Sequence, residues 1–269
     1  MSEVMQPLSA SDRAWLANIW LVATDMDGTL TRGDRFVPEL LQALQDLERA
    51  AIRVIIVTGR SAGWVSGVGA YLPVAGAIAE NGGLFCPHST VDAPQLLTDI
   101  PDIDAHRRAL SATFDRLKAR FPDIQTAADN QFRVTDWTFE NQTFSAPDLE
   151  EMRSLCARDG WGFTYSAVQC HVKPVEQDKA RGLMRAIGDR FPAVSSRNIL
   201  TVGDSPNDES LFDPQRFPHS AGVANLKRYE TVLTHLPARV TQAEEGAGFC
   251  ELAEWVLRSR QSHIKSPAM

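Results

Sequence analysis

One short stretch near the start of the chain limits what the remaining sequence can fold into. Residues 19–23 form a nearly continuous apolar run, and the carboxylates of Asp25 and Asp27 follow it closely. Such a run is typical of a strand that is covered on both faces in a parallel sheet. Because ionised groups are costly inside that layer, we expect both carboxylates just beyond the strand, where open α/β sheets bind ligands.

The residues that follow favour a chemical role for the two carboxylates. An isolated pair of aspartates separated by one residue more often belongs to a turn or a helix cap. In this chain the pair follows an apolar run and precedes Gly28, which lets the backbone turn, and Thr29, which adds a hydroxyl. We therefore predict that the strand presents Asp25 and Asp27 to water, a metal ion or a phosphate.

Strands and helices are predicted to alternate over much of the chain. Residues 38–50 carry leucines at helical spacing, and Pro38 suits the first turn of a helix. Further buried strands are predicted at residues 53–57, 74–79, 198–202 and 220–224, with a last helix at residues 249–257. Right-handed crossovers between parallel strands place the polar ends of these strands on one edge of the sheet. The pattern predicts a Rossmann-like α/β core.

Polar residues next to these elements have a functional and a structural interpretation. Thr58 either caps the following helix or grips a phosphate oxygen, aided by nearby backbone N–H groups. Asn81 lies in the polar segment Glu80–Gly83, which also suits a tight turn. Lys179 is predicted in the first turn of a helix, where the helix dipole disfavours a cation. It is therefore either an ordinary surface lysine or a residue that binds an anion.

A second acidic segment follows the predicted strand at residues 198–202. It runs from Gly203 to Asp208 and contains the side chains of Asp204, Asn207 and Asp208. Oxygen ligands of this kind suit Mg²⁺. Since two acidic strand ends occur in one α/β chain, the sequence favours a hard-cation site over an ordinary loop.

The sequence changes in character between the two halves of the predicted core. Residues 85–172 have weaker apolar runs and more aromatic side chains, so we predict an inserted α+β cap between core segments 1–84 and 173–269. Helices are predicted there at residues 103–120 and 147–159, and strands at residues 131–137 and 161–170. Its interior is expected to contain Phe132, Trp137, Phe139 and Trp161.

Composition and charge argue against several classes of protein. The 269 residues carry a formal net charge of −7 without a dense cluster of Lys or Arg, which argues against a nucleic-acid partner. The N-terminus does not resemble a signal peptide, and no apolar run is long enough to cross a bilayer. Four widely spaced cysteines suit a reduced, cytoplasmic protein. No glycine pattern typical of a dinucleotide site or a Walker A loop is present.

Four motifs taken together resemble those of the haloacid dehalogenase superfamily, in its phosphatase branch. They are Asp25–Leu30, Thr58–Arg60, Lys179 and Gly203–Asp208, and they occur in the order that the family has. The predicted insertion lies where the Cof-like group (type IIB) carries its α/β cap. Glu80–Gly83 and Gly203–Asp208 are most similar to mannosyl-3-phosphoglycerate phosphatases and, after these, to sucrose-phosphate phosphatases.

The resemblance implies a division of tasks among the motif residues. Asp25 is expected to attack phosphorus and become an aspartyl phosphate, and Asp27 to protonate the leaving alcohol and later accept a proton from water. Thr58 and Lys179 are expected to bind the oxygens of the transferring phosphoryl group. The expected Mg²⁺ ligands are the Asp25 carboxylate, the Asp27 carbonyl and Asp204, with Asn207 and Asp208 completing or orienting the shell.

Residues beyond the motifs are expected to contact the substrate. Arg60 lies next to the phosphate-binding hydroxyl and is expected to reach the leaving group. Asn81, His171 and Lys173 are further expected contacts, and Arg133 in the cap is considered with them. For the cap residues, an ordinary surface or structural role is the alternative.

The implied activity is Mg²⁺-dependent hydrolysis of a sugar-phosphate monoester, with a glycosyl-3-phosphoglycerate as the favoured substrate. One alternative is a hexose-phosphate phosphomutase on the same fold. Another is a non-catalytic sugar-phosphate sensor, or a signalling receiver in which Asp25 is only phosphorylated. The expected partner is a small phosphorylated molecule, with neither a nucleic acid nor a membrane. The sequence gives no indication of the oligomeric state.

Overall fold

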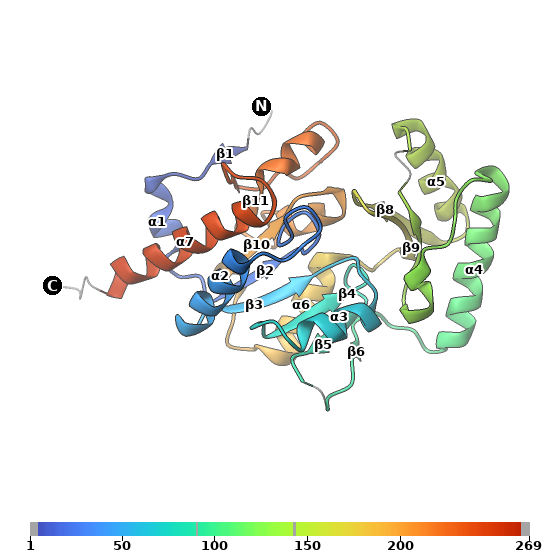
Figure 1. Ribbon diagram of the computed structural model, residues 1–269. Coiled ribbons are helices and arrows are strands. Elements are labelled where there is room, and N and C mark those ends of the chain that lie inside the picture. The colour runs from blue at the N-terminus through green and yellow to red at the C-terminus, as the bar shows by residue number, and fades with distance from the viewer. Residues whose placement is uncertain (1–4, 90, 142–143, 265–269) are drawn as a thin grey trace.

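The computed structural model of this chain describes residues 5–89, 91–141 and 144–264 and contains two separate sheets (Figure 1). The larger sheet has the strand order β1-β12-β11-β10-β2-β3-β4-β5-β6. Its strands are β1 (Gln6–Pro7), β2 (Leu21–Thr24), β3 (Arg53–Val57), β4 (Gly76–Ala79), β5 (Leu84–Pro87), β6 (Gln95–Leu96), β10 (Ile199–Gly203), β11 (His219–Gly222) and β12 (Arg239–Val240). Neighbouring strands from β1 to β4 are parallel, whereas β5 pairs antiparallel with β4 and with β6.

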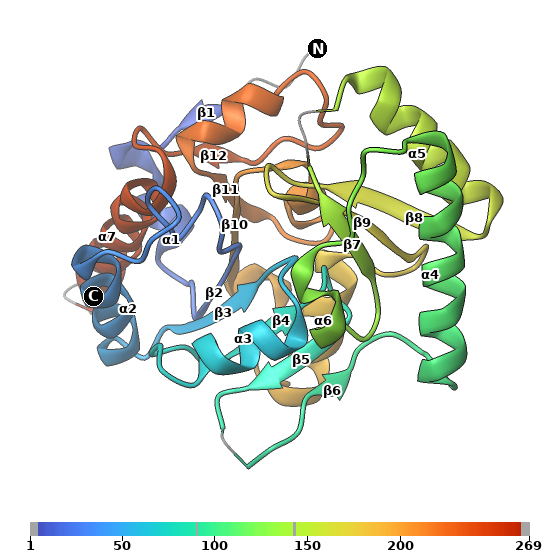
Figure 2. The same ribbon diagram turned by 45° about the vertical axis from the view of Figure 1, so that its right-hand side comes forward.

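Helices cover both faces of this sheet, which explains why its central strands are apolar throughout. In β2, Val22 packs into the core on one face, and Leu21 and Ala23 pack into the core on the other. The first face is covered by α1 (Arg13–Leu16), α2 (Pro38–Arg49), α3 (Ala62–Gly69) and α7 (Glu245–Ile264). The opposite face is covered by α6 (Lys179–Arg190) (Figure 2). The predicted α/β fold class is confirmed.

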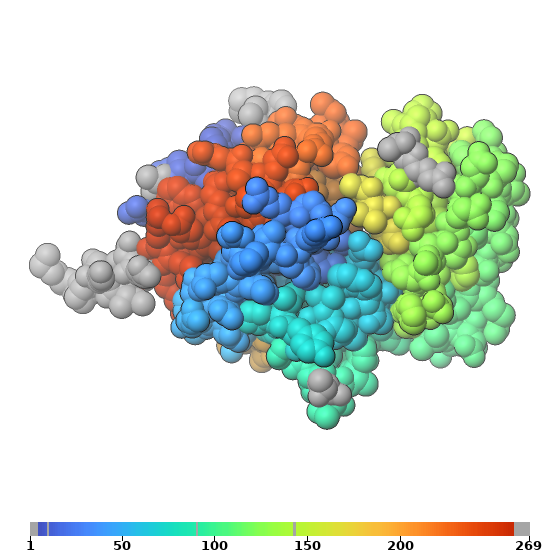
Figure 3. All heavy atoms as spheres, in the orientation of Figure 1, coloured from blue at the N-terminus to red at the C-terminus, as the bar shows by residue number. Residues whose placement is uncertain are grey.

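The inserted segment forms a cap with its own hydrophobic core. Strands β7 (Trp137–Glu140), β8 (Trp161–Tyr165) and β9 (Gln169–Pro174) form an antiparallel sheet in the order β7-β9-β8. Helices α4 (Ile103–Arg120) and α5 (Ala146–Arg158) pack on it through residues such as Leu117, Phe139 and Met152. Figure 3 shows the cap lying beside the cyan part of the core. No helix within the described ranges combines the length and the apolar character that crossing a bilayer requires.

Two predictions within the cap are wrong in detail. The strand predicted at residues 131–137 is replaced by a short 3₁₀ helix, Ala128–Phe132, and β7 starts only at Trp137. The side chain of Asn130 explains the change, because it bonds to both the N–H and the C=O of Thr138 and holds the chain in a turn. Phe132, predicted in the cap interior, is consequently 55% exposed.

The strand predicted at residues 161–170 is in fact two strands joined by a turn. Ser166 stabilises this turn, since its Oγ accepts hydrogen bonds from the N–H groups of Val168 and Gln169. The two strands, β8 and β9, pair antiparallel, with Trp161 opposite Pro174. As a result, the turn of this hairpin and the start of β9 point towards the carboxyl edge of the core sheet.

The domain boundaries predicted at residues 85 and 172 fall inside strands. Strands β5 (Leu84–Pro87) and β6 (Gln95–Leu96) still belong to the core sheet, because β5 pairs with both β4 and β6. The second boundary falls within β9, which continues to Pro174. The two chain segments that connect core and cap meet where the hydroxyl of Thr98 donates a hydrogen bond to Gln177, at 3.0 Å.

Helix α6 approaches the core sheet unusually closely at Gly182. A Cβ atom at this position would lie 2.4 Å from the Cα of Gly82, in the loop after β4. Gly182 follows Lys179 by three residues and therefore shares its helix face. The close contact of the two glycines is what lets the start of α6 carry Lys179 to the edge of the sheet.

We predict that Gly182→Ala destabilises the protein, whereas Gly188→Ala in the same helix does not. The new methyl group at Gly182 meets backbone, and overpacking of this kind costs about 1–3 kcal/mol. Gly188 is exposed and has nothing within 4 Å of its Cβ position, so alanine there should stabilise the helix by about 0.5–1 kcal/mol. Urea unfolding of both variants measures the difference; equal midpoints would show that the contact with Gly82 does not constrain α6.

Candidate active site

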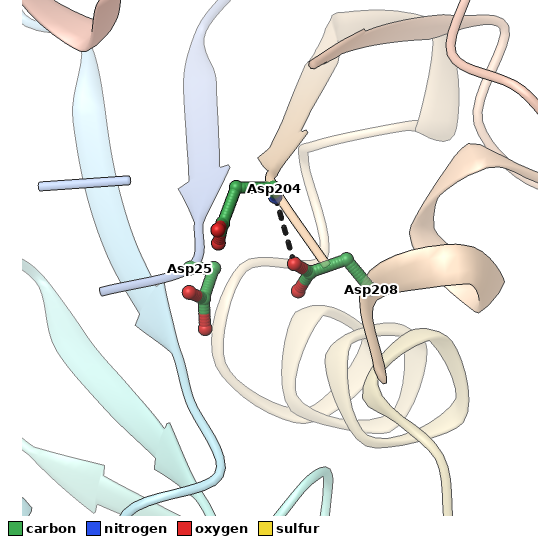
Figure 4. Close-up of side chains that lie close together, drawn as sticks. All are labelled: Asp25, Asp204 and Asp208. Carbon is green, nitrogen blue, oxygen red and sulfur yellow. Dashed lines mark hydrogen bonds between the residues drawn. The ribbon is translucent and has the colours of Figure 1, made fainter. Parts of the chain in front are cut away.

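The carboxyl ends of β2 and β10 lie side by side and bring the two acidic segments together. The strands pair in parallel, with Thr24 opposite Val202, and the N–H of Asp25 donates to the carbonyl of Val202 at 2.9 Å. Figure 4 shows that Asp25, Asp204 and Asp208 direct their carboxylates into one small space. The sheet order therefore joins residues that are about 180 positions apart in the sequence.

Two of these three carboxylates contact the ammonium group of Lys179. One ligand oxygen from each of Asp25, Asp204 and Asp208 lies within 4.8 Å of the other two. Lys179 Nζ lies 2.5 Å from Asp25 Oδ1 and 2.7 Å from Asp208 Oδ1. Its side chain is fully buried, which rules out an ordinary surface lysine. The cluster of three buried carboxylates thus has one ammonium, which pairs with two of them.

The excess of negative charge shows in the proton affinities of the site. Burial raises the pKa of Asp25 to about 7, and the carboxylates of Asp208 and Asp27 act in the same direction while Lys179 opposes them. Burial also raises the pKa of Asp204 well above its ordinary value, with further contributions from Asp25 and Asp208. For Lys179, burial lowers the pKa, but Asp208 and Asp25 together raise it above the ordinary value.

A divalent cation fits this arrangement. The donors that the three aspartates offer are oxygens, the ligand type that Mg²⁺ prefers, and they are close enough to share one ion. A cation would also supply the positive charge that a single lysine leaves lacking. Asn207, a predicted part of the metal shell, contacts the side chains of Ser205 and Asn81.

Backbone and side-chain contacts fix the orientation of each acid. Asp208 Oδ2 accepts hydrogen bonds from the N–H groups of Asp204 and Ser205 at 2.9 and 3.1 Å, which turns its other oxygen towards Lys179. Thr29 Oγ1 donates to Asp204 at 3.2 Å. Gly28 has a φ of +82°, and a Cβ atom there would lie 2.5 Å from Asp204 Oδ2. Only glycine fits beside that carboxylate.

Asn225 is a site residue that the sequence analysis missed. Its Nδ2 donates to Asp204 at 2.9 Å and to the carbonyl of Gly28 at 3.0 Å, and its Oδ1 accepts from the N–H of Glu245. It lies in the 3₁₀ segment Ala224–Tyr229, which follows β11. A single asparagine after a short strand has no distinctive sequence pattern, so only the fold reveals its place.

Thr58 and Arg60 lie at the end of β3, next to Asp25 and Asp27. Thr58 is buried, and its hydroxyl accepts a hydrogen bond from the N–H of Arg60 at 3.2 Å. Arg60 forms a bidentate ion pair with Asp27, with distances of 2.9 and 2.7 Å. Its guanidinium carbon also lies 5.4 Å from the centroid of the Trp64 ring. The guanidinium of Arg60 is thus paired with the carboxylate of Asp27.

The predicted substrate contacts are divided between two cavities. Arg60 and His171 line a small cavity over Asp25, Asp27 and Thr58, which leaves about 20 Å³ for the centre of a water-sized molecule. Asn81 and Lys173 line a larger cavity of about 300 Å³ on the other side of Asn207. Cap residues Ser166, Val168 and Gln169 close the small cavity from above. Space for about one water molecule remains over the carboxylates.

Asn81 and Lys173 are both buried and differ in how well their polar groups are satisfied. The Oδ1 of Asn81 accepts from Asn207, whereas its Nδ2 has no hydrogen-bond partner. The ammonium of Lys173 donates to the carbonyl of Gln177. Burial lowers the pKa of Lys173 to about 8.

Comparisons with known proteins agree with this geometry. Residues 22–96 match the family described as haloacid dehalogenase-like hydrolase. A phosphoglycolate phosphatase from Methanobrevibacter smithii is 27% identical over 199 residues, which cover 72% of this chain and 82% of that protein. Because the match covers 72% of a chain of 269 residues, it includes the inserted cap in the middle of the chain.

Several solved structures have the same fold as this chain. A structure from Thermoplasma acidophilum aligns with a TM-score of 0.71 at 19% identity and covers 89% of this chain and 99% of that one. The sucrose-phosphatase of Synechocystis, solved with sucrose and phosphate, aligns with a TM-score of 0.61 at 15% identity and covers 89% and 98%. At these identities the likeness shows the fold alone.

We predict that the metal-free protein loses stability as the pH rises through about 7. The pKa of Asp25 is raised to about 7 in the folded protein, above the unfolded value of about 3.9, so the folded state holds a proton that the unfolded state has lost. This contribution is complete at low pH and disappears above the folded pKa. Added Mg²⁺ favours the ionised form and should reverse the trend.

Thermal unfolding midpoints, measured from about pH 5.5 to about pH 8.5 with and without Mg²⁺, test this linkage. The rise in midpoint on adding Mg²⁺ should be larger at the alkaline end. Asp25→Asn serves as the matched control, because its side chain has no proton to release. A stabilisation by Mg²⁺ that is the same at every pH would contradict the expected coupling.

Proposed function

We propose that this chain, which is similar to haloacid dehalogenase-like hydrolases over residues 22–96, is a phosphatase that hydrolyses a small phosphate monoester in two steps through Asp25. The observation that carries this proposal is the placement of the Asp25 carboxylate at the end of β2, 2.5 Å from Lys179, beside a second acidic strand end. A carboxylate held in this way lines the small cavity as a nucleophile with a cation next to it.

In the first step, an oxygen of Asp25 attacks phosphorus and the bond from phosphorus to the leaving oxygen breaks. Asp27 gives a proton to that oxygen, so the product leaves as an alcohol. In the second step, Asp27 removes a proton from water, which attacks phosphorus and releases inorganic phosphate from Asp25. The two carboxylates therefore have different tasks, although they are separated by a single residue.

Arg60 engages the side chain of Asp27 in the substrate-free site. Its guanidinium donates to both carboxylate oxygens, at 2.9 and 2.7 Å. A substrate whose anionic leaving group attracts the guanidinium of Arg60 would free the carboxyl group of Asp27 to face the leaving oxygen. Arg60 thus serves as a contact for the leaving group and positions Asp27 when no substrate is bound.

Positive charge at the site offsets the repulsion between the phosphate and the carboxylates. Lys179 binds an oxygen of the phosphoryl group while keeping its contact with Asp208, and the hydroxyl of Thr58 donates to another. Mg²⁺, held by the carboxylates of Asp25 and Asp204 and the carbonyl of Asp27, with Asp208 oriented behind them, would supply further charge stabilisation when bound.

A phosphate ester of a short hydroxy acid is the substrate class that fits best. The cavity over Asp25 leaves about 20 Å³, so the cap covers a compact leaving group with far less rearrangement than a disaccharide. The relatives that match along most of the chain are named phosphoglycolate phosphatase. A glycosyl-3-phosphoglycerate, favoured by the motif resemblance, also carries a carboxylate near its phosphate. It stays an alternative that requires the cap to open further.

The experiment that tests the function is a phosphate-release assay over a panel of metabolites. The panel contains 2-phosphoglycolate, 3-phosphoglycerate, mannosyl- and glucosyl-3-phosphoglycerate, sucrose 6-phosphate and simple hexose phosphates. Release of phosphate without a bisphosphate activator separates hydrolysis from the phosphomutase alternative. Binding of these esters without any release of phosphate would instead favour the sensor.

We predict that Asp25→Asn and removal of divalent metal each abolish the release of phosphate. The amide of the variant is a much poorer nucleophile than a carboxylate, and chelation by EDTA removes charge that the phosphate needs. Mg²⁺ added back should restore the wild-type protein and leave Asp25→Asn inactive. Unchanged activity of Asp25→Asn on every ester in the panel would overturn the proposed mechanism.

We further predict that Asp27→Asn lowers turnover far more than it weakens Mg²⁺ binding. The side chain of Asp27 moves a proton, a task worth about 10²- to 10⁴-fold in rate, whereas its expected metal ligand is the backbone carbonyl. Turnover and the Mg²⁺ concentration for half-maximal activity are measured on the same preparation. Losses of similar size in both quantities would show that the side chain of Asp27 also serves the metal.

A further inference from the structure

Arg133 of the cap lies at the joint between cap and core and lines neither of the two cavities. Its side chain is 0% exposed, so it cannot contact a substrate in the way considered from the sequence. Burying a guanidinium is costly unless its N–H groups are paired. The partners that this guanidinium has found therefore indicate its role.

Each terminal nitrogen of Arg133 bridges structural elements. Nη1 donates to the backbone carbonyl of Gly59 in the core at 2.9 Å and to both carboxylate oxygens of Asp136 at 3.0 and 3.1 Å. Nη2 donates to Asp129 at 2.9 Å and to the side-chain carbonyl of Gln169 at 2.8 Å. One side chain thus connects a core loop to three positions in the cap.

The partners of Arg133 belong to the site over Asp25. Gly59 lies between Thr58 and Arg60, and these three residues form the loop that is called the phosphate-binding loop below, after the proposed role of Thr58. Gln169 lines the small cavity, and so does His171, whose Nδ1 lies 2.9 Å from the carboxylate of Asp136. The guanidinium therefore holds the cap residues that face Asp25 and the core loop that binds the phosphate.

The backbone next to Arg133 is attached to the core by Glu80. This carboxylate is fully buried and accepts hydrogen bonds from the N–H of Val134 at 3.1 Å and from the N–H of Thr135 at 2.6 Å. It also accepts from the N–H of Ala62, at the start of α3, at 3.1 Å. Glu80 thus joins the cap backbone to the helix that follows the phosphate-binding loop.

The surface of the loop is shaped for this contact. A Cβ atom at Gly59 would lie 3.0 Å from Cε1 and 3.1 Å from Nε2 of His171. The imidazole of His171 therefore rests directly on the backbone of the loop, with no room for a side chain between them. If the cap lifts away from the loop, His171 moves away from Gly59 and the guanidinium of Arg133 leaves the Gly59 carbonyl.

We propose that Arg133 is a positioning residue that couples the seating of the cap to the shape of the phosphate-binding loop. When the guanidinium bonds to Gly59, the loop around Thr58 is ordered and Gln169 and His171 are held over Asp25. When the cap lifts, both halves of the site lose their support at the same moment. The kinetic part of this proposal rests on the proposed phosphatase function, whereas the ordering of the loop does not.

The first test compares Arg133→Lys with Arg116→Lys. Lysine keeps the charge at position 133 but cannot bond to Gly59, Asp129, Asp136 and Gln169 together. Arg116 is also a cap arginine in an ion pair, with Asp159 at 2.7 Å, but its side chain is 56% exposed and contacts no core residue in the interactions described. Hydrogen exchange of the intact protein is followed in peptides that cover residues 58–64.

Residues 58–64 belong to the core, so faster hydrogen exchange there in Arg133→Lys supports the coupling. Arg116→Lys should exchange at the wild-type rate in the same residues. Turnover divided by KM for p-nitrophenyl phosphate should fall about 10- to 100-fold in Arg133→Lys, with weaker inhibition by inorganic phosphate, because the loop is misplaced. Faster exchange confined to the cap, with phosphate inhibition unchanged, would overturn the proposal. Hydrogen exchange gives an answer even if no phosphate ester proves to be a substrate.

A second variant leaves the buried charges untouched. Gly59→Val places a side chain under His171 and should prevent the cap from seating, whereas Gly67→Ala in α3 has open space and serves as its control. Gly59→Val should reproduce the faster exchange and the weaker phosphate inhibition of Arg133→Lys. Wild-type exchange in residues 58–64, and in the cap residues 133–136, would show that the contact with the loop does not govern seating.

Discussion

Three buried carboxylates that lie together beside a single ammonium group are the constraint on which this molecule depends. Asp25 and Asp208 contact Lys179 at the edge of the sheet, and Asp204 lies close to both carboxylates. Burial and mutual repulsion make the ionised form of this cluster unfavourable, and they therefore raise the pKa of both Asp25 and Asp204. The fold holds the carboxylates together through Gly28, Asn225 and the backbone N–H groups that donate to Asp208. The excess negative charge is therefore available to attract a cation.

The catalytic core was predictable because its side chains follow from local pattern and sheet topology. Asp25, Thr58 and Asp204 each come just after an apolar strand, and parallel strands with right-handed crossovers bring such ends together. Lys179 could be suspected from its unfavourable place at a helix start. Its burial could not, because that depends on the contact between Gly182 and Gly82 across the sheet.

The cap was harder to predict because its decisive contacts are not local. Asn130 turns the chain just before the segment predicted to be a strand, and it does so by bonding to Thr138. Arg133 looks like any surface arginine in the sequence, yet its carbonyl partner at Gly59 is 74 residues away. Asn225 has the same difficulty, since its partner Asp204 lies beyond a complete strand. Patterns of hydrophobicity describe layers well and describe polar joints between layers poorly.

The joint at Thr98 and Gln177 has a consequence for how proteins of this shape diversify. The chain leaves the core and returns to it at neighbouring points, so the covalent connections of the cap lie side by side. Strands β2 and β10 pair with each other and with β3 and β11, all of which belong to the core. Evolution can therefore exchange or remodel the cap as a module, which changes the molecules that are admitted while the chemistry beneath is inherited intact.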